Sequence, residues 1–132
     1  MTDENHDPIL QCPKCGVDMR KLDAGSCMVD RCENCYGIWL DAGERHKLVQ
    51  DKKQIKAIDI GPTDVGRKQN KVTDILCPRC KESMIHMRHP AQQHIEFEVC
   101  TKCRGSFFDA GELDDLTDFT VFERIKALLG IR

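Results

Sequence analysis

The sequence has few aromatic residues and no long apolar segment. Its 132 residues include one Trp, one Tyr and five Phe, whereas charged residues make up 32%. A chain with so little bulky apolar material cannot bury a large core, and modules of about 50 residues usually need a metal ion or disulfides for stability. The length fits one ordinary domain or two very small ones. We therefore expect stability to depend on more than apolar packing.

An export signal is also lacking, because the first ten residues, MTDENHDPIL, contain neither a basic segment nor an apolar one. No apolar run approaches the length of a membrane span. We therefore expect a cytoplasmic protein with no membrane-bound part. Thiols stay reduced in the cytoplasm, so the nine cysteines, an odd number, are better suited to bind metal than to form disulfides.

The sequence has no excess of positive charge, since its formal net charge is −2. Four thiolates on one divalent ion leave −2 per site, so two filled sites would bring the net charge to about −6. This balance disfavours broad, charge-driven binding of nucleic acid, although it is compatible with a local basic patch.

One pattern occurs twice in the chain. Both copies contain a Cys-Pro-x-Cys motif, a Cys-x-x-Cys motif and a tail that ends in Asp-Ala-Gly-Glu. These lie at residues 12–15, 32–35 and 37–44 in the first copy, and at 77–80, 100–103 and 105–112 in the second. Agreement in order and spacing predicts two modules of one design. We expect domains over 9–58 and 74–132, joined by a linker over 59–73 that is rich in Gly, Pro and polar residues.

The segment between the Cys pairs of each copy is predicted to form a β-hairpin. In the second copy Ile95, Phe97 and Val99 alternate with polar residues, as in a strand with one buried face. The pattern is weaker in the first copy, where Cys27 and Val29 occupy the positions of Ile95 and Phe97.

A helix is predicted after each second Cys pair. Asp41 with Glu44, and Asp109 with Glu112, have the spacing of a capping box, in which each carboxylate binds a backbone amide. We expect these helices over about 42–57 and 110–117.

The end of the chain is predicted to form an amphipathic helix. Thr120 and Glu123 repeat the capping spacing. The apolar stripe that follows consists of Phe122, Ile125, Leu128 and Leu129. We expect it to pack on the second module over Phe97 and Phe107. The alternative is an exposed helix that binds a partner or a second copy of the chain.

The paired cysteines predict two structural zinc ions. Such a site needs four tetrahedral ligands, and each Cys-x-x-Cys turn supplies two of them. The two pairs are separated by 16 residues in the first copy and by 19 in the second, within the range of zinc sites. Iron in a rubredoxin-type site is an alternative, because the ligand geometry is the same. A thioredoxin-like dithiol is a further one, but its motif belongs in a βαβ unit.

One further cysteine and three histidines are potential ligands outside the two Cys sets. Cys27 is expected to be a buried apolar residue, because its counterpart in the second copy is apolar; a redox sensor or a spare ligand is the alternative. His86, His89 and His94 cluster in the second hairpin and are candidates for binding metal or phosphate. We expect a solvated polar face instead, because the first copy has Lys21 in place of His86.

Together these motifs resemble the TFIIB-type zinc-ribbon family. The pattern Cys-Pro-x-Cys followed by Cys-x-x-Cys-x-Gly-x-Trp-Leu-Asp-x-Gly-Glu extends from Cys12 to Glu44, and its second copy from Cys77 to Leu113. The resemblance implies a small metal-stabilised α+β fold of two tandem zinc ribbons with Zn²⁺ as the metal. It assigns Cys12, Cys15, Cys32 and Cys35 to one ligand set, and Cys77, Cys80, Cys100 and Cys103 to the other.

No catalytic set is apparent beyond the ligand cysteines, and a structural zinc site leaves no open position. We therefore expect a non-enzymatic protein-interaction or transcription-associated adaptor, whose partner is a protein such as the transcription machinery. One alternative is a nucleic-acid-binding zinc ribbon, which the lack of interleaved aromatic and basic residues disfavours. Another is a redox or metal-handling protein with rubredoxin-like iron.

Overall fold

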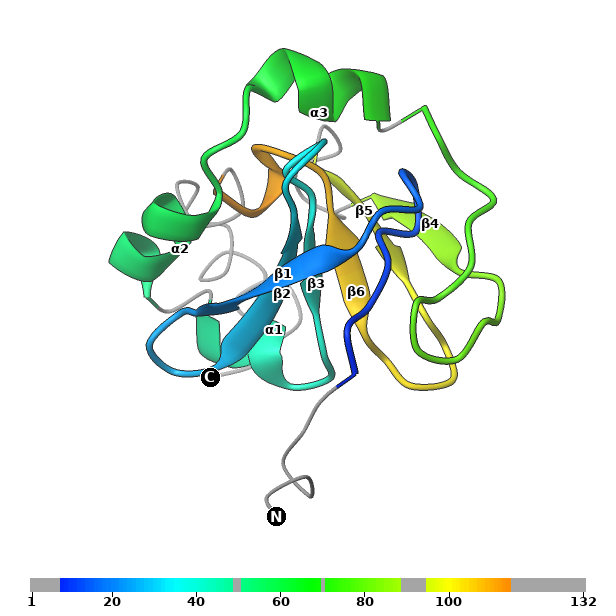
Figure 1. Cartoon of the computed structure of the whole chain (residues 1–132), viewed down its shortest axis with the longest axis horizontal. Coiled ribbons are helices and arrows are strands. Elements are labelled where there is room, and N and C mark those ends of the chain that lie inside the picture. Colours follow the sequence, from blue (N-terminus) through cyan, green and yellow to red (C-terminus); the bar gives the residue numbers. More distant parts are fainter. Residues whose placement is uncertain (1–7, 49–50, 70, 89–94, 115–132) are drawn as a thin grey trace, which may run out of the picture.

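The computed structural model describes residues 8–48, 51–69, 71–88 and 95–114. Within these ranges the chain forms short strands and short helices (Figure 1). The elements are β1 (Met19–Asp23), β2 (Met28–Cys32), β3 (Ile38–Leu40), α1 (Glu44–Leu48), α2 (Lys52–Ile58), α3 (Thr63–Gln69), β4 (Ile85–Arg88), β5 (Glu96–Val99) and β6 (Ser106–Phe108). This arrangement confirms the predicted small α+β fold.

Both copies contribute to one six-stranded sheet with the order β1-β2-β3-β6-β5-β4. The copies meet at its centre, where β3 and β6 pair antiparallel (Figure 1). Trp39 lies opposite Phe107, which occupies the same position in the repeat. Antiparallel pairing of equivalent residues places a local two-fold axis between the strands, perpendicular to the sheet.

The two faces of the sheet have different covers, because successive side chains of a strand point to opposite faces. On one face, Ile38, Leu40 and Phe108 pack with residues of α1 and α2. The apolar side chains that these helices contribute are Leu48, Ile55 and Ile58. The other face carries Trp39 and Phe107, and these two rings pack among the cysteines.

A glycine of each copy lies against the aromatic ring of the other copy. A Cβ atom at Gly37 would lie 2.3 Å from Cζ of Phe107, and one at Gly105 would lie 2.2 Å from Cζ2 of Trp39. Real Cβ atoms do not come so close to carbon. The Gly-x-aromatic part of the motif is therefore explained by contact between the copies.

The predicted hairpins are present as β1–β2 and β4–β5. Val29 pairs with Leu22, and the equivalent Phe97 pairs with Met87. The predicted domain boundaries stay a prediction, but the two copies share one sheet and are packed together.

The helices differ in part from the prediction. The expected helix over 42–57 is found as two helices, of which α2 begins after Asp51, whose Oδ1 accepts a hydrogen bond from the backbone N of Gln54 at 3.3 Å. The expected linker over 59–73 contains α3, so it is not without regular structure. A Cβ at Gly66 of this helix would lie 2.0 Å from the carbonyl oxygen of Ala110, which indicates that tertiary contact holds α3 in place.

The capping boxes are also used differently from the prediction. Glu44 Oε1 accepts a hydrogen bond from the backbone N of Asp41 at 2.8 Å, which is one half of the predicted box. In the second copy a carboxylate from outside the repeat caps the turn. Asp59 accepts hydrogen bonds from the backbone N of Gly111 and of Asp114, both at 2.8 Å.

Some predictions lie outside the described residues. Of the helix expected over 110–117, the structure describes the part up to Asp114, which is helical from Glu112. The terminal helix with its stripe, as well as His89 and His94, lies outside the described ranges.

Candidate metal centres

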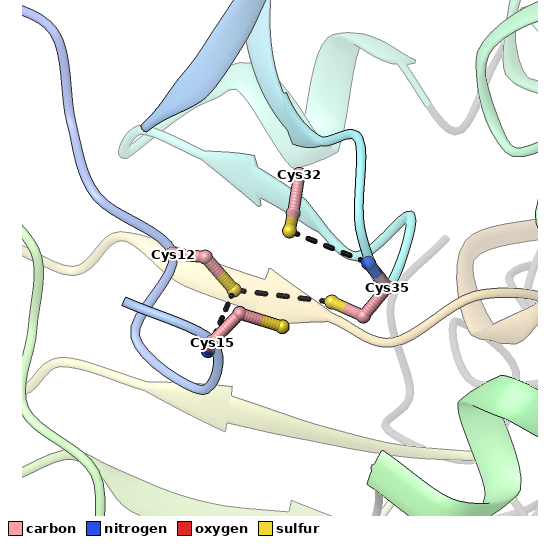
Figure 2. Close-up of side chains that lie close together, drawn as sticks. All are labelled: Cys12, Cys15, Cys32 and Cys35. Atoms are coloured by element: carbon pink, nitrogen blue, oxygen red, sulfur yellow. Dashed lines mark hydrogen bonds between the residues drawn. The ribbon is translucent and has the colours of Figure 1, made fainter. Parts of the chain in front are cut away.

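Four cysteines of the first copy meet on the sheet face that carries Trp39 (Figure 2). Cys12 and Cys15 lie in the turn before β1, whereas Cys32 is the last residue of β2 and Cys35 lies in the turn that follows it. Their four Sγ atoms lie within 4.8 Å of one another, and the Cys12 and Cys35 Sγ atoms are 3.8 Å apart. Four thiolates bound tetrahedrally to zinc at about 2.3 Å would be about 3.8 Å apart. The group is therefore suited to hold one zinc ion.

The second copy builds the same arrangement. Cys77, Cys80, Cys100 and Cys103 form a second group with all Sγ atoms within 4.8 Å of one another. The Sγ atoms of Cys77 and Cys103 are 3.7 Å apart. Each predicted ligand set is thus brought together in space, and the chain has two Cys₄ centres for two zinc ions.

Each Cys-x-x-Cys turn closes in the same way. The residue after the second cysteine has a positive φ, and its backbone N–H donates to the carbonyl of the first cysteine at 2.7–2.9 Å. These residues are Gly16 (φ 78°), Tyr36 (φ 63°), Lys81 (φ 63°) and Arg104 (φ 66°). The backbone N–H of the second cysteine also donates to the Sγ atom of the first at 3.3–3.4 Å. Such amide donors stabilise thiolate charge and orient the ligand atoms.

Burial disfavours ionised thiols unless a cation is present. Burial raises the pKa of Cys15 to about 11 and that of Cys77 to about 12. The hydrogen bond with Cys12 lowers the pKa of Cys35 to about 5. Four thiolates in either group are therefore disfavoured without a cation, and a bound divalent cation would supply the compensating positive charge.

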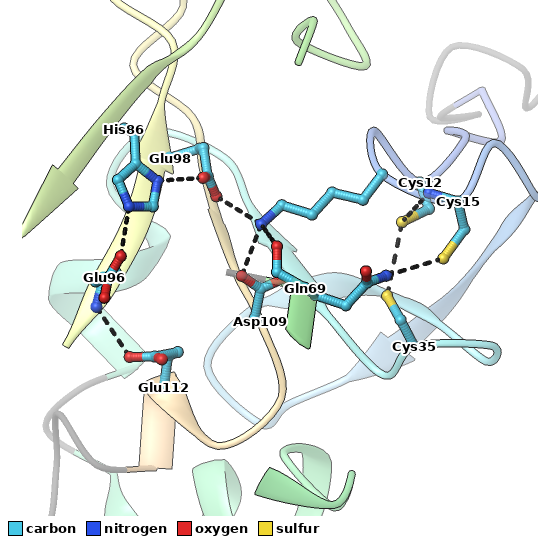
Figure 3. Close-up of polar contacts among 10 residues, drawn as sticks. Cys12, Cys15, Cys35, Gln69, His86, Glu96, Glu98, Asp109 and Glu112 are labelled. Atoms are coloured by element: carbon cyan, nitrogen blue, oxygen red, sulfur yellow. Dashed lines mark hydrogen bonds and ion pairs between the residues drawn. The ribbon is translucent and has the colours of Figure 1, made fainter. Parts of the chain in front are cut away.

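The first centre has further hydrogen-bond donors around it. Asn34 Nδ2 lies 3.3 Å from the Sγ atom of Cys15. Gln69 Nε2 lies 3.5 Å from the same sulfur atom (Figure 3). Gln69 belongs to α3, within the segment that the sequence predicts as a linker. No sequence signal marks it, because its role depends on where the helix packs.

The variable residue of each Cys-Pro-x-Cys turn makes contacts that the sequence does not predict. Lys14 Nζ donates to Asp109 Oδ2 and to the carbonyl of Gln69, both at 2.7 Å, and lies 3.4 Å from Glu98 Oε1 (Figure 3). Arg79, the equivalent residue, donates to both carboxylate oxygens of Asp41, at 2.6 and 2.9 Å. The shared signal is that both copies have a basic residue at this position.

Burial disfavours the ionised form of Asp109. Its side chain is fully buried, and burial raises its pKa to about 7 against the opposing effect of Lys14. Its Oδ1 atom is buried without a hydrogen-bond partner among the residues that the structure describes. The ammonium group of Lys14 is therefore important for keeping this carboxylate ionised.

His86 has a different setting from the solvated face predicted for it. Its Nδ1 lies 2.5 Å from Glu98 Oε2 and its Nε2 lies 2.6 Å from Glu96 Oε1 (Figure 3). Burial by itself would lower the pKa of His86, but the hydrogen bonds that the two glutamates accept outweigh burial and raise the pKa. His86 thus lies between two carboxylates that favour its protonated form, and Lys21 takes the equivalent place opposite Asp30 in the first copy.

Cys27 lies apart from both ligand groups. It is half-buried and packs against the apolar cluster beneath α1 and α2. This position agrees with the expected role of a small apolar residue.

Two Cys₄ centres on antiparallel hairpins define a zinc-binding protein with two tandem zinc ribbons. The chain belongs to the TFIIB-type zinc-ribbon family, described as transcription factor zinc-finger, whose model matches residues 11–51 and 76–118. This match confirms the resemblance and its two copies. No curated protein and no solved structure matches the chain significantly. In the described part of the chain, no helix has the length and apolarity needed to cross a membrane.

Proposed function

We propose that this protein is a non-enzymatic adaptor, and that it binds a protein of the transcription machinery. Each centre offers four thiolates, which fill the tetrahedral coordination of zinc and leave no position for a substrate or a reactive water. Zinc then has a structural role, and the function depends on which molecule binds to the surface of the protein.

The observation that carries the proposal is a row of exposed apolar side chains on the second copy. Leu76, Ile85 and Met87 are 51%, 50% and 42% exposed. Leu76 is bridged to Ser83, and residues 83, 85 and 87 alternate along one strand direction. The three apolar side chains therefore project to the same side of the sheet.

The first copy supplies an internal comparison for this row. Gln11, Arg20 and Leu22 occupy the positions of Leu76, Ile85 and Met87, counted from the first cysteine of each copy. Gln11 and Arg20 are polar and exposed, so the fold does not require apolar residues there. Exposed apolar residues that the fold does not need are typical of an interaction site.

The strand that carries most of this row is also at an edge of the sheet. β4 is the last strand in the sheet order and pairs with β5 (Figure 1). A strand with exposed apolar residues at a sheet edge favours contact with another protein. The negative net charge of the chain favours a protein over nucleic acid as the partner. Transcription enters through the family, whose description names transcription factors.

Binding to purified RNA polymerase from the same cell tests the proposal. The full-length zinc-loaded chain should bind the polymerase, and the double variant Leu76→Gln/Ile85→Arg should bind at least about tenfold more weakly. This variant carries the residues of the first copy, so we expect it to fold.

Met28→Glu is a matched control, because it places the residue of the second copy, Glu96, at an exposed apolar position of the first. It should bind like the unchanged chain. Absence of binding by the zinc-loaded chain would refute the polymerase as partner. Equal binding by the double variant would refute the role of the row, and binding to nucleic acid alone would favour the alternative zinc-ribbon function.

A further inference from the structure

The first cysteine turn of each copy carries a cation that pairs with a carboxylate of the other copy. Lys14 contacts Asp109 at 2.7 Å, and Arg79 contacts Asp41 at 2.6 Å. The two aspartates are equivalent, since both begin the Asp-Ala-Gly-Glu tail. The ion pairs are therefore exchanged between the copies.

The pair that starts at the first centre is the more deeply buried one. The side chains of Lys14, Glu98 and Asp109 are at most 1% exposed. Arg79 and Asp41 are 24% and 32% exposed. Removing one partner of a buried ion pair is strongly destabilising, because the remaining charge stays uncompensated.

The positions of these cations depend on the metal. Lys14 lies between Cys12 and Cys15, and Arg79 lies between the equivalent cysteines of the second centre. When zinc binds, both cysteines of the turn become ligands and the conformation of the residue between them is fixed. We expect that without zinc the turn is less restrained, so that the cation is held less firmly against the other copy.

The second cysteine turn of each copy leads directly into the strand that joins the copies. The backbone N of Cys32 donates to the carbonyl of Gly37, and that of Cys100 donates to the carbonyl of Gly105, both at 2.9 Å. β3 and β6 begin at the next residue in each case. Each centre is therefore next to a cation that pairs with the other copy and to a strand of its own copy that pairs with the other copy.

We propose that the two centres bind zinc cooperatively, because zinc at either centre positions the cation that neutralises the buried or half-buried aspartate of the other copy. The effect must be reciprocal, since a coupling free energy between two sites acts equally on both. We expect zinc at one centre to raise the affinity of the other about 5- to 150-fold, the usual range for coupled sites. At limiting zinc the empty and the doubly loaded forms should therefore be more populated, and the singly loaded form less populated, than for independent centres.

The affinity of the first centre tests this coupling in the full chain. Zinc is titrated against a chelator of known affinity, in the unchanged protein and in Cys100→Ser/Cys103→Ser, which lacks the second centre. The variant should bind its remaining zinc at least about fivefold more weakly. An unchanged affinity of the first centre would overturn the proposal.

The part played by the exchanged ion pairs needs a second comparison. In a Lys14→Met/Arg79→Met background, removing the second centre should change the affinity of the first by a smaller factor than it does in the unchanged background. Lys56→Met is the control, because Lys56 in α2 forms an exposed pair with Asp114, at 3.0 Å, away from the cysteine turns. It should leave the coupling intact.

Undiminished coupling in the Lys14→Met/Arg79→Met background would refute the role of the ion pairs. If that background does not fold, Arg79→Met alone replaces it, because this pair is the more exposed one. The single variant should lose part of the coupling, and full coupling would again contradict the proposal.

Discussion

At the scale of single residues, the close approach of glycine and ring fixes how the copies meet. Gly37→Ala and Gly105→Ala should each lower the free energy of unfolding by about 1–3 kcal/mol, because the new methyl group overlaps the ring of Phe107 or Trp39. The two losses should be similar, since the contacts are equivalent. Urea unfolding in excess zinc measures both.

Gly43 provides the control for these substitutions. A Cβ there would meet no atom within 4 Å, although its φ of +87° disfavours other residues. Gly43→Ala should therefore cost about 1–2 kcal/mol through the backbone alone, without loss of contact between the copies. Hydrogen exchange in β3 and β6 should rise in the first two variants and stay unchanged in this one. Unchanged exchange in all three would contradict the proposed contact.

His86 predicts a dependence of stability on pH. Its pKa is raised in the folded protein, so its contribution is fully present below the unfolded pKa of about 6.5. The contribution is lost as pH rises through the folded pKa, because the imidazolium between Glu96 and Glu98 then loses its proton.

The variant His86→Lys isolates this effect. It carries the residue of the first copy, whose amine stays charged up to about pH 10. As pH rises from about 6.5, the unchanged protein should lose stability relative to the variant, measured by urea unfolding at a fixed concentration of free zinc. Parallel curves for the two proteins would mean that His86 does not titrate in this range.

At the scale of elements, α3 packs closely against Ala110 of the second copy. Gly66→Ala should push the helix away from the carbonyl of Ala110 and lower the free energy of unfolding by about 1–3 kcal/mol. Because Gln69 at the end of α3 accepts a hydrogen bond from Lys14, hydrogen exchange should also increase around the first centre. Mass spectrometry of exchanged peptides tests this, and unchanged exchange over 63–69 would show that α3 does not rely on the contact.

The hairpins could be predicted from the sequence because alternation of apolar residues is a local signal. The ligand sets could be predicted for the same reason, since each turn needs two cysteines at a fixed short spacing. α3 could not be predicted, because a short segment with Gly66 has weak helix propensity and is held by contact with Ala110.

The acidic residues of the Asp-Ala-Gly-Glu tails have partners that the local sequence pattern does not predict. The spacing of Asp41 and Glu44 predicted a capping box, and Glu44 does bind the backbone N of Asp41. The side chain of Asp41 instead accepts hydrogen bonds from Trp39 Nε1 and from Arg79. Asp109 similarly accepts a hydrogen bond from Lys14, which is far away in the sequence. A partner in the other copy leaves no mark in the local spacing.

At the scale of the whole molecule, folding should depend on zinc in both halves at once. Binding of structural zinc contributes on the order of 10 kcal/mol in comparable peptides, and apolar burial alone is small here. Chelation should therefore abolish the circular dichroism signal of the sheet in one transition. Elemental analysis beforehand should find two zinc ions per chain, and iron in their place would favour the rubredoxin-like alternative.

Substitution of one ligand separates a shared unit from two independent modules. The sequence suggests that Cys32→Ser disrupts mainly the first copy and Cys100→Ser mainly the second. The sheet formed by both copies predicts that either change increases hydrogen exchange in both hairpins. Exchange at the unchanged rate in β1 and β2 of Cys100→Ser would support two independent modules.

The pairing of Trp39 with its own counterpart, Phe107, has a consequence for how the two halves of the molecule can differ. A symmetric homodimer has such pairing at its centre. A chain with only one copy of the repeat would therefore complete this sheet only by associating with a second, identical chain. Here the covalent connection supplies an effective concentration of the order of millimolar, and assembly no longer depends on how much protein the cell makes. The fused halves are also free to diverge, with Arg20 at one edge and Ile85 at the other. A homodimer would have two identical sheet edges, whereas the two edges of this molecule differ.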